Sequence, residues 1–237
     1  MNIAIIPARS GSKRIKNKNT KKFINEPIII KTIKNLKKSK MFDEIYVSTD
    51  SPRIANLVKK LGVKIPFYRK KKLSNDKTIT YVVIVDFLKR LKNKKIKNVT
   101  CIYPTSVFIK KQYLIKAKKL LNKNMSKYIM SVTNYSHPIQ RAFIINKKKV
   151  KMIFKKNMNK RTQDLSESYH DAAQFYMARI KTWEQNKINF NKNCIALKIK
   201  NTDVQDIDNL YDWKSPSASP TDNLYSPNSS KIPNVRI

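Results

Sequence analysis

Residues 1–8 read MNIAIIPA, a short apolar run that ends just after a proline and leads directly into the basic stretch RSGSKRIKNKN. A continuous apolar run of this length is typical of a parallel strand that is buried on both faces. Residues 27–38 then repeat apolar side chains at helical spacing and end in lysines, which suit the carboxyl end of a helix. The N-terminal segment therefore predicts a strand, a basic loop and a helix.

The alternation of strand and helix continues along the chain. Further strands are expected at 44–50, 63–68 and 99–104, and further helices at 51–62, 78–92 and 110–122. Ser51 is suited to cap the helix that follows it, Pro52 to occupy the first helical position, and Gly62 to end the helix. Such alternation predicts an α/β fold with a mostly parallel sheet and helices on both faces, where ligands bind beyond the carboxyl ends of the strands.

The second half of the chain is organised differently. Strand-like sequence at 128–135 leads into residues 134–170, which lack a helical period and contain the basic patch KKKVKMIFKKNMNKR. This region is interpreted as an inserted arm. Apolar strands return at 173–180 and 194–199. One domain is therefore expected over residues 1–213, followed by a flexible Ser, Pro and Asn-rich tail at 214–237.

Length and hydropathy fit a protein of ordinary globular type. A chain of 237 residues with 41% hydrophobic content can bury a full core. No apolar run approaches the roughly 18 to 20 residues of a membrane span, and the N-terminal run is too short for a signal peptide. These features predict a soluble, cytoplasmic protein with no membrane partner. Cys101 and Cys194 each lie in an apolar strand, which favours buried free thiols over a disulfide.

The formal net charge is +37, with 52 Lys and Arg against 15 Asp and Glu. Such a charge suggests a nucleic-acid or anionic-membrane partner. The lysines and asparagines are scattered through every predicted element, however, and only two glycines occur. A coding bias towards Lys, Asn and Ile produces the same picture. We therefore expect no specific nucleic-acid partner, with weak RNA binding at low salt as the alternative.

The basic loop after the first strand suits a polyphosphate ligand. It places a glycine and several cations at the carboxyl end of a strand, where backbone amides and charged donors can approach phosphate oxygens. The loop lacks the GxxxxGK[ST] pattern of a Walker loop. The alternative is an ordinary basic turn in a lysine-rich protein.

A second candidate site is acidic. Asp206 and Asp208 follow a predicted strand, with Asp203 and Asp212 nearby, in a chain that has few acidic residues. Carboxylates two residues apart in an extended segment point to the same side and can hold one hard cation. The alternative is a solvated acidic turn that caps a helix.

Residues 6–19, IPARSGSKRIKNKN, resemble the signature IPAR-x-GSK-x(4)-KN of the sugar cytidylyltransferases, which have a Rossmann-like nucleotidyltransferase fold. The resemblance implies CTP as co-substrate. The residues implied to act on its phosphates are Arg9, Lys13, Lys18 and Asn19, with the backbone of Ala8, Ser10, Gly11 and Ser12 as a cradle.

Two further segments match the same family. The segment 68–80 resembles the cytosine-recognising stretch of the family, which implies that Arg69, Thr78 and Thr80 lie near the base. The two threonines could instead cap the following helix. The string DID followed by DW resembles the metal-binding end of the family and implies Mg²⁺ bound by Asp206 and Asp208.

The string HDAAQFY at 170–176 and the segment SVTNYSHPIQRAF resemble the pseudaminic acid cytidylyltransferases, whose usual string is HDAGQFY. The implied reaction joins CTP and pseudaminic acid into CMP-pseudaminic acid and pyrophosphate. Alternative acceptors are N-acetylneuraminate, legionaminate and an octulosonate, and an RNA-binding protein on the same fold is an alternative of another class. The residues implied to line the sugar pocket are Tyr103, Thr105, Arg141, Arg161, Gln163, His170 and Gln174.

The resemblance also implies an oligomeric state, and the sequence departs from the family pattern at some positions. In the family the arm mediates dimerisation and completes the partner's site, so a homodimer is expected. For His170 a structural hydrogen bond that orients the loop is as good an interpretation as sugar contact. Asn25 and Ala173 replace glycines of the family. Asparagine tolerates left-handed geometry, so the turn at Asn25 is expected to survive.

Overall fold

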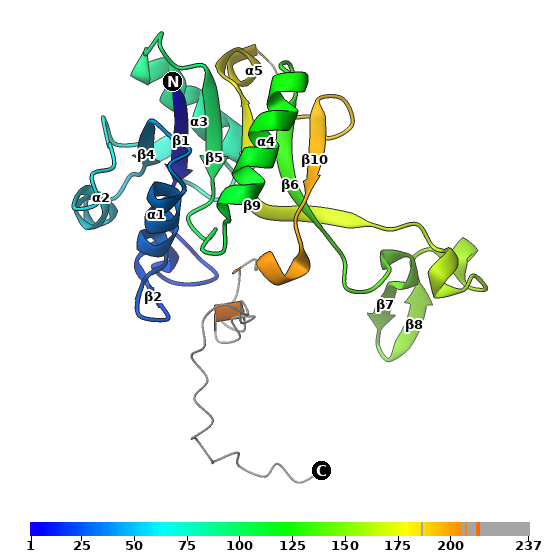
Figure 1. Ribbon diagram of the computed structural model, residues 1–237. Helices are drawn as coiled ribbons and strands as arrows, with labels where there is room; N and C mark the ends of the chain where they lie inside the picture. Colours follow the sequence, from blue (N-terminus) through cyan, green and yellow to red (C-terminus); the bar gives the residue numbers. More distant parts are fainter. Residues whose placement is uncertain (186, 205–206, 208–211, 214–237) are drawn as a thin grey trace, which may run out of the picture.

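The computed structural model describes residues 1–185, 187–204, 207 and 212–213, which form a six-stranded sheet flanked by helices, with two separate small hairpins (Figure 1). The order of strands in the sheet is β10-β6-β9-β5-β1-β4. Its members are β1 (Asn2–Pro7), β4 (Glu44–Ser48), β5 (Asn98–Ile102), β6 (Tyr128–Asn134), β9 (Tyr169–Arg179) and β10 (Cys194–Lys198). The predicted tail at 214–237 lies outside the described residues.

The centre of the sheet is built on β1. This strand pairs in parallel with β4 and with β5, so that Ile5 lies opposite Tyr46 on one side and Cys101 on the other. β10 also pairs in parallel with β6. β9 alone among the six runs antiparallel, between β5 and β6. The prediction of an α/β fold with a mostly parallel sheet is confirmed.

Helices cover both faces of the sheet. The helices are α1 (Ile28–Ser39), α2 (Pro52–Lys59), α3 (Thr80–Leu91), α4 (Lys111–Lys123) and α5 (Ile180–Gln185). Ala4 and Ile6 of β1 pack on the face covered by α1, α2 and α4, whereas Ile3 and Ile5 pack on the face covered by α3 and α5. Burial on both faces explains why β1 is continuously apolar. Each buried isoleucine stabilises the fold by roughly 1.5–3 kcal/mol.

Two of the local expectations can be compared directly with the structure. Ser51 caps α2, because its hydroxyl accepts a hydrogen bond from the Ile54 amide at 3.3 Å, and Pro52 occupies the first turn. The predicted strand at 63–68 is wrong: only Lys64 makes a bridge, to Tyr46. Pro66 within this segment has no amide hydrogen to donate to a ladder, so the pairing stops.

The inserted arm lies apart from the sheet (Figure 1). Its hairpin pairs β7 (Phe143–Asn146) with β8 (Lys149–Met152) and has almost no buried side chains. The short 3-10 helices of the chain are η1 (Lys18–Thr20), η2 (Lys71–Leu73), η3 (Ile139–Arg141), η4 (Lys155–Asn157), η5 (Thr162–Asp164) and η6 (Asn201–Asp203). Within the described part of the chain, no helix has both the length and the apolar character needed to cross a bilayer.

The two thiols differ in environment. Both Cys101 and Cys194 are free, as expected from the sequence. Cys101 is fully buried in β5, and burial raises the pKa of its thiol. Cys194 is only partly buried, at the start of β10.

A tight hairpin, β2 (Lys22–Phe23) and β3 (Glu26–Pro27), joins the basic loop to α1. The turn between its strands survives without glycine, as expected. The left-handed residue of this turn is Ile24, with a φ of 62°, and Asn25 is not among the residues with positive φ. A β-branched side chain is strained in this region of φ.

We expect Ile24→Gly to raise the free energy of unfolding by about 1 kcal/mol, because the substitution removes left-handed strain. Ile24 is 49% exposed, so little packing is lost. The melting temperature should rise by about 2–4 °C. Asn25→Gly is the matched control and should destabilise by about 0.5–1 kcal/mol through backbone entropy. Calorimetry that found Ile24→Gly no more stable than Asn25→Gly would contradict the assignment of strain.

Candidate active site

A cavity of about 580 Å³ opens at the carboxyl ends of β1 and β5. The loop after β1, the segment 69–80 and the loop after β5 form its walls. Its lining residues are Pro7, Arg9, Ser12, Lys13, Arg14, Lys18, Asn19, Arg69, Leu73, Asn75, Asp76, Thr78, Thr80, Val83, Tyr103, Pro104 and Thr105. Most of the residues expected to contact nucleotide are thus brought together, although they come from two separate stretches of sequence, 9–19 and 69–80.

Backbone contacts hold the start of the basic loop against the sheet. The Ala8 amide donates to the Ser48 carbonyl at 2.9 Å and so extends the pairing of β1 with β4. The side-chain amide of Asn19 donates to the Arg9 carbonyl at 2.9 Å, which ties the two ends of the loop together. Asn19 is itself buried. The loop that carries the cations is therefore fixed at both ends.

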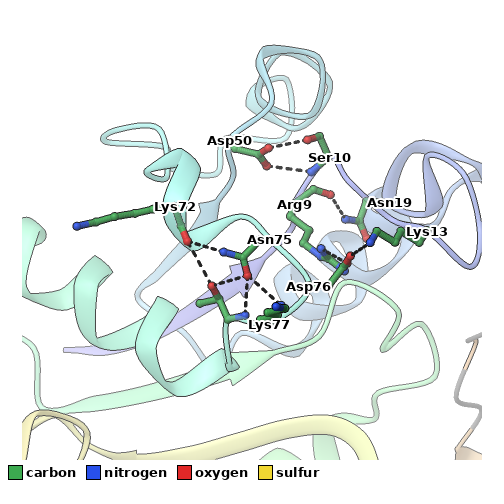
Figure 2. A network of polar contacts seen from close by, with 10 residues as sticks. Arg9, Ser10, Lys13, Asn19, Asp50, Lys72, Asn75, Asp76 and Lys77 are labelled. Carbon is green, nitrogen blue, oxygen red and sulfur yellow. Dashed lines mark hydrogen bonds and ion pairs between the residues drawn. The ribbon is translucent and has the colours of Figure 1, made fainter.

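Ser10 faces away from the cavity, towards Asp50 at the end of β4. Its amide and its hydroxyl donate to the two carboxylate oxygens of Asp50, at 2.9 and 2.5 Å (Figure 2). Ala8, Ser10 and Gly11 do not line the cavity, whereas Ser12 does. The loop residues that line the cavity are thus Arg9 and, from Ser12 onward, residues that include Lys13 and Arg14.

Arg69 is a buried cation at the wall of the cavity. Its Nε donates to the Ser48 hydroxyl at 3.2 Å and its guanidinium also donates to the Ser48 carbonyl. Burial lowers the pKa of Arg69 to about 10, and the nearby Asp50 carboxylate partly opposes this shift. The guanidinium therefore stays charged at neutral pH and is held in one orientation by the end of β4.

Thr78 and Thr80 line the cavity beside Arg69. The Thr78 hydroxyl donates to the Asn75 side chain at 3.0 Å, and the Thr80 hydroxyl lies 3.4 Å from the hydroxyl of Tyr103. The residue at the N-cap of α3 is Ile79, with no side-chain capping bond. The alternative that these threonines cap the helix is therefore wrong.

The sequence did not single out Asn75 and Asp76, which also line the cavity. Asp76 pairs with Nη1 of Arg9 at 2.5 Å and with Nζ of Lys13 at 2.7 Å (Figure 2). Hydrogen bonds from Lys13 and Arg9 lower the pKa of Asp76. The Ser-Asn-Asp string at 74–76 is a turn signal, but a pairing across more than sixty residues leaves no mark in sequence.

The residues expected to bind sugar fall into two groups. Tyr103 and Thr105 line the main cavity. The arm residues have local partners: Arg141 donates to the Met158 carbonyl at 3.2 Å, and Arg161 makes a two-point contact with Asp164 at 2.9 and 3.1 Å.

Gln163 lines a separate hollow of about 300 Å³ within the arm. Nδ1 of His170 lies 2.9 Å from the carbonyl of its neighbour Asp171, and the ring packs on Tyr135 at 4.8 Å between centroids. These contacts fit the alternative that His170 orients its loop. Within one chain, neither Gln163 nor His170 reaches the main cavity.

Gln174 lies on a bulge of β9. Between the pairs Met130–Tyr176 and Val132–Asp171, β9 contains more residues than β6, and Ala173 within the bulge has a φ of 48°. The glycine that the family has here would suit this conformation. The structure thus locates the departure from the family pattern at a position that requires left-handed geometry.

Because of the bulge, Gln174 forms hydrogen bonds with neighbouring segments of the protein. Its carbonyl accepts hydrogen bonds from the Tyr103 amide at 3.1 Å and from the Ser106 hydroxyl at 2.9 Å. Its side-chain amide donates to the Asp203 carbonyl at 2.7 Å. Gln174 is only 3% exposed and does not line the cavity. It holds the loop that carries Tyr103.

Asp203, in η6, is tied to the first turn of α4. Its buried carboxylate accepts hydrogen bonds from Lys110 Nζ and from the Tyr113 hydroxyl, both at 2.7 Å. Burial opposes ionisation of Asp203, but the contacts with Lys110 and Tyr113 hold its pKa below the usual value.

The chain then returns to the basic loop. Ile207 is buried in a cluster with Ile15 and Phe23, and the Trp213 indole donates to the Lys22 carbonyl at 3.1 Å. Asp206 and Asp208 lie outside the described residues. Among the residues that are described, no three His, Cys, Asp or Glu side chains gather into a possible metal site.

Solved structures share this architecture. CMP:2-keto-3-deoxy-manno-octonic acid synthetase, solved in complex with CTP, superposes with a TM-score of 0.65 over 89% of this chain and 95% of that chain, at 13% identity. At this level of identity the superposition establishes a shared α/β fold.

Sequence comparison gives the family. A family model described as Cytidylyltransferase matches residues 3–211, and the chain belongs to this family of enzymes. The chain is 36% identical to the pseudaminic acid cytidylyltransferase of Campylobacter jejuni, over 89% of this chain and 92% of that protein. It is also 36% identical to a Helicobacter pylori protein named as pseudaminic acid cytidylyltransferase and a hydrolase, over 86% of this chain and 40% of that protein. The resemblance stated from the motifs is confirmed, and the RNA-binding alternative finds no support in these comparisons.

We expect Asp203→Asn to lower the free energy of unfolding at pH 7 by about 1–3 kcal/mol, because Lys110 and Tyr113 lose an ionised partner. The folded-state pKa of Asp203 is depressed, so its contribution is present above the unfolded pKa of about 3.9 and is lost as pH falls through the folded pKa. The difference between variant and wild type should therefore shrink in acid.

Urea unfolding between pH 7 and about pH 2 measures this difference. Asp164→Asn serves as the control, because Asp164 forms an exposed pair with Arg161 and its loss should change stability by less than about 1 kcal/mol. An equal destabilisation by Asp203→Asn at every pH would show that the charge of Asp203 plays no part.

Proposed function

We propose that the protein transfers CMP from CTP to pseudaminic acid and releases pyrophosphate. The observation that carries the proposal is that cations of the loop after β1 line the same cavity as Arg69, Thr78 and Thr80. The names of the two sequence relatives and the string HDAAQFY support pseudaminic acid as the acceptor. N-acetylneuraminate, legionaminate and an octulosonate are the acceptors to be tested against it.

The reaction is a substitution at the α-phosphate of CTP. The anomeric hydroxyl oxygen of the sugar forms a bond to the α-phosphorus, the bond to the bridging oxygen of the β-phosphate breaks, and the hydroxyl proton is released. Arg9, Lys13 and Lys18 would neutralise the charge that develops on pyrophosphate, and the fixed loop would align the triphosphate. No covalent intermediate with the protein is required.

The far wall of the cavity suits a pyrimidine. Arg69 is held rigidly by Ser48 and presents a fixed donor. The hydroxyls of Thr78 and Thr80 can donate or accept, as the edge of cytosine requires. We infer that these three side chains recognise the base.

Asp206 and Asp208 would hold Mg²⁺, whose charge would offset that of the triphosphate and orient it for transfer. Ile207, which lies between these two aspartates in the sequence, is buried in one cluster with Ile15 of the basic loop. The described lining of the cavity contains a single carboxylate, Asp76, which is already paired with cations. The ligands are therefore proposed from the two aspartates alone.

The arm would act across a homodimer. Arg141, Arg161 and His170 have local partners, and these three residues and Gln163 lie outside the main cavity of their own chain. The hairpin of the arm exposes Phe143, Ile145 and Val150 at 57%, 72% and 63%. An apolar surface of this kind marks an interaction site. We infer that it packs on a second copy, whose cavity the arm completes.

Both substrates are small, charged and water-soluble, and CTP is an intracellular nucleotide. We therefore also infer a cytoplasmic location for the reaction.

The reaction is tested by measuring pyrophosphate release from purified protein with CTP and pseudaminic acid, with and without Mg²⁺. Parallel reactions contain N-acetylneuraminate, legionaminate or an octulosonate. We expect turnover with pseudaminic acid to exceed turnover with the other sugars and to require Mg²⁺. Absence of turnover with every acidic sugar would overturn the proposal.

In the same assay we expect Lys13→Met to lower kcat/KM by about 10² or more, because a charge that faces the leaving pyrophosphate is removed. Lys119→Met removes a charge from the exposed side of α4 and is the matched control, with unchanged kinetics. If both variants lost activity equally, the effect would come from net charge rather than from the loop.

The arm is tested by light scattering of the protein in solution. Ile145→Asp places a charge on the exposed hairpin and should convert a dimer to a monomer, because burying an unpaired carboxylate is costly. Phe190→Asp is the control, since Phe190 is 62% exposed but lies in the loop before β10. A wild-type monomer, or a variant that stays dimeric, would contradict the role given to the arm.

A further inference from the structure

Asp76 places a negative charge among the cations of the cavity. Its two carboxylate oxygens contact different partners, Arg9 through Oδ1 at 2.5 Å and Lys13 through Oδ2 at 2.7 Å. Both partners belong to the basic loop, whereas Asp76 comes from the segment before α3 (Figure 2). The Asp76 carboxylate therefore links two walls of the cavity, the segment before α3 and the basic loop, instead of pairing with residues of its own segment.

The segment that carries Asp76 is ordered by its neighbour. The Asn75 side-chain oxygen accepts hydrogen bonds from the amides of Lys77 and Thr78, both at 2.9 Å, and its amide donates to the Lys72 carbonyl at 2.7 Å. This Asx turn fixes the backbone on either side of Asp76. The carboxylate is therefore presented to the loop by a defined turn rather than by a freely moving side chain.

We propose that Asp76 is an internal counter-ion that occupies Arg9 and Lys13 in the free enzyme and that the phosphates of the nucleotide must displace. The inference rests on the proposed function, because it takes Arg9 and Lys13 as ligands of the triphosphate. A carboxylate and a phosphate oxygen offer the same kind of acceptor to these cations. The two anions therefore compete for one pair of donors.

The competition has a consequence for both ends of the reaction. Before the nucleotide binds, Asp76 occupies the two cations, so anions from solution do not pair with them. The affinity of the free enzyme for any polyphosphate is therefore lower. After transfer, the carboxylate is available to take back Arg9 and Lys13 as pyrophosphate departs. Asp76 is thus a positioning residue that weakens binding of substrate and product alike.

The test measures binding of inorganic pyrophosphate to the full chain by calorimetry and the KM for CTP by turnover. Asp76→Asn keeps the shape of the side chain and removes its charge, and Asp76→Ala removes the acceptor entirely. Both variants should bind pyrophosphate about three- to tenfold more tightly than the wild type. This factor corresponds to the free energy of the two exposed ion pairs that each variant loses. The KM for CTP should fall by a similar factor, and inhibition by pyrophosphate should strengthen.

Asp86→Asn is the matched control. Asp86 also pairs with two cations, Lys70 at 3.1 Å and Arg90 at 3.6 Å, but it lies on α3 and does not line the cavity. Its removal should leave pyrophosphate affinity unchanged. Equal or weaker pyrophosphate binding by both Asp76 variants, with the melting temperature retained, would overturn the proposal. A wild-type protein that binds neither pyrophosphate nor CTP would instead overturn the proposed function.

Discussion

The parallel pairing of β1 with β4 and β5 is the constraint on which the site depends. Three strands that run side by side in the same direction end at the same edge of the sheet. The loop after β1, Arg69 bonded to the end of β4 and Tyr103 after β5 therefore meet there. Because β1 is buried on both faces, a polar substitution within it would disturb the core and the cavity together.

Much of this arrangement could be predicted from local pattern. The apolar run of β1, the cap at Ser51 and the helical periods of α1 and α4 each act over a few residues, and the structure contains each of them. The cations of the loop could be assigned because the motif at residues 6–19 is long and specific. Local chemistry and fold agree in these segments, which is typical of a well-specified sequence.

The remaining features depend on contacts between distant segments. The segment 63–68 resembles a strand, but Pro66 cannot continue the ladder. Asp76 finds its partners only after the sheet has formed, so its sequence context shows a turn and nothing more. Gln174 belongs to a motif associated with sugar, yet the bulge turns its side chain towards Asp203. The sequence predicted which residues gather at the cavity better than it predicted the contacts that each residue makes.

The residues in left-handed conformation at the ends of two helices account for part of the large positive charge of the chain. α1 and α3 each end at a lysine in left-handed conformation, Lys40 with a φ of 53° and Lys92 with a φ of 49°, where glycine is the common choice. A cation at this place interacts favourably with the negative end of the helix dipole, which offsets part of the backbone strain. Lysine thus serves as a helix terminator in a chain with two glycines. Part of the charge is then a by-product of how the chain ends its helices and need not reflect a polyanionic partner.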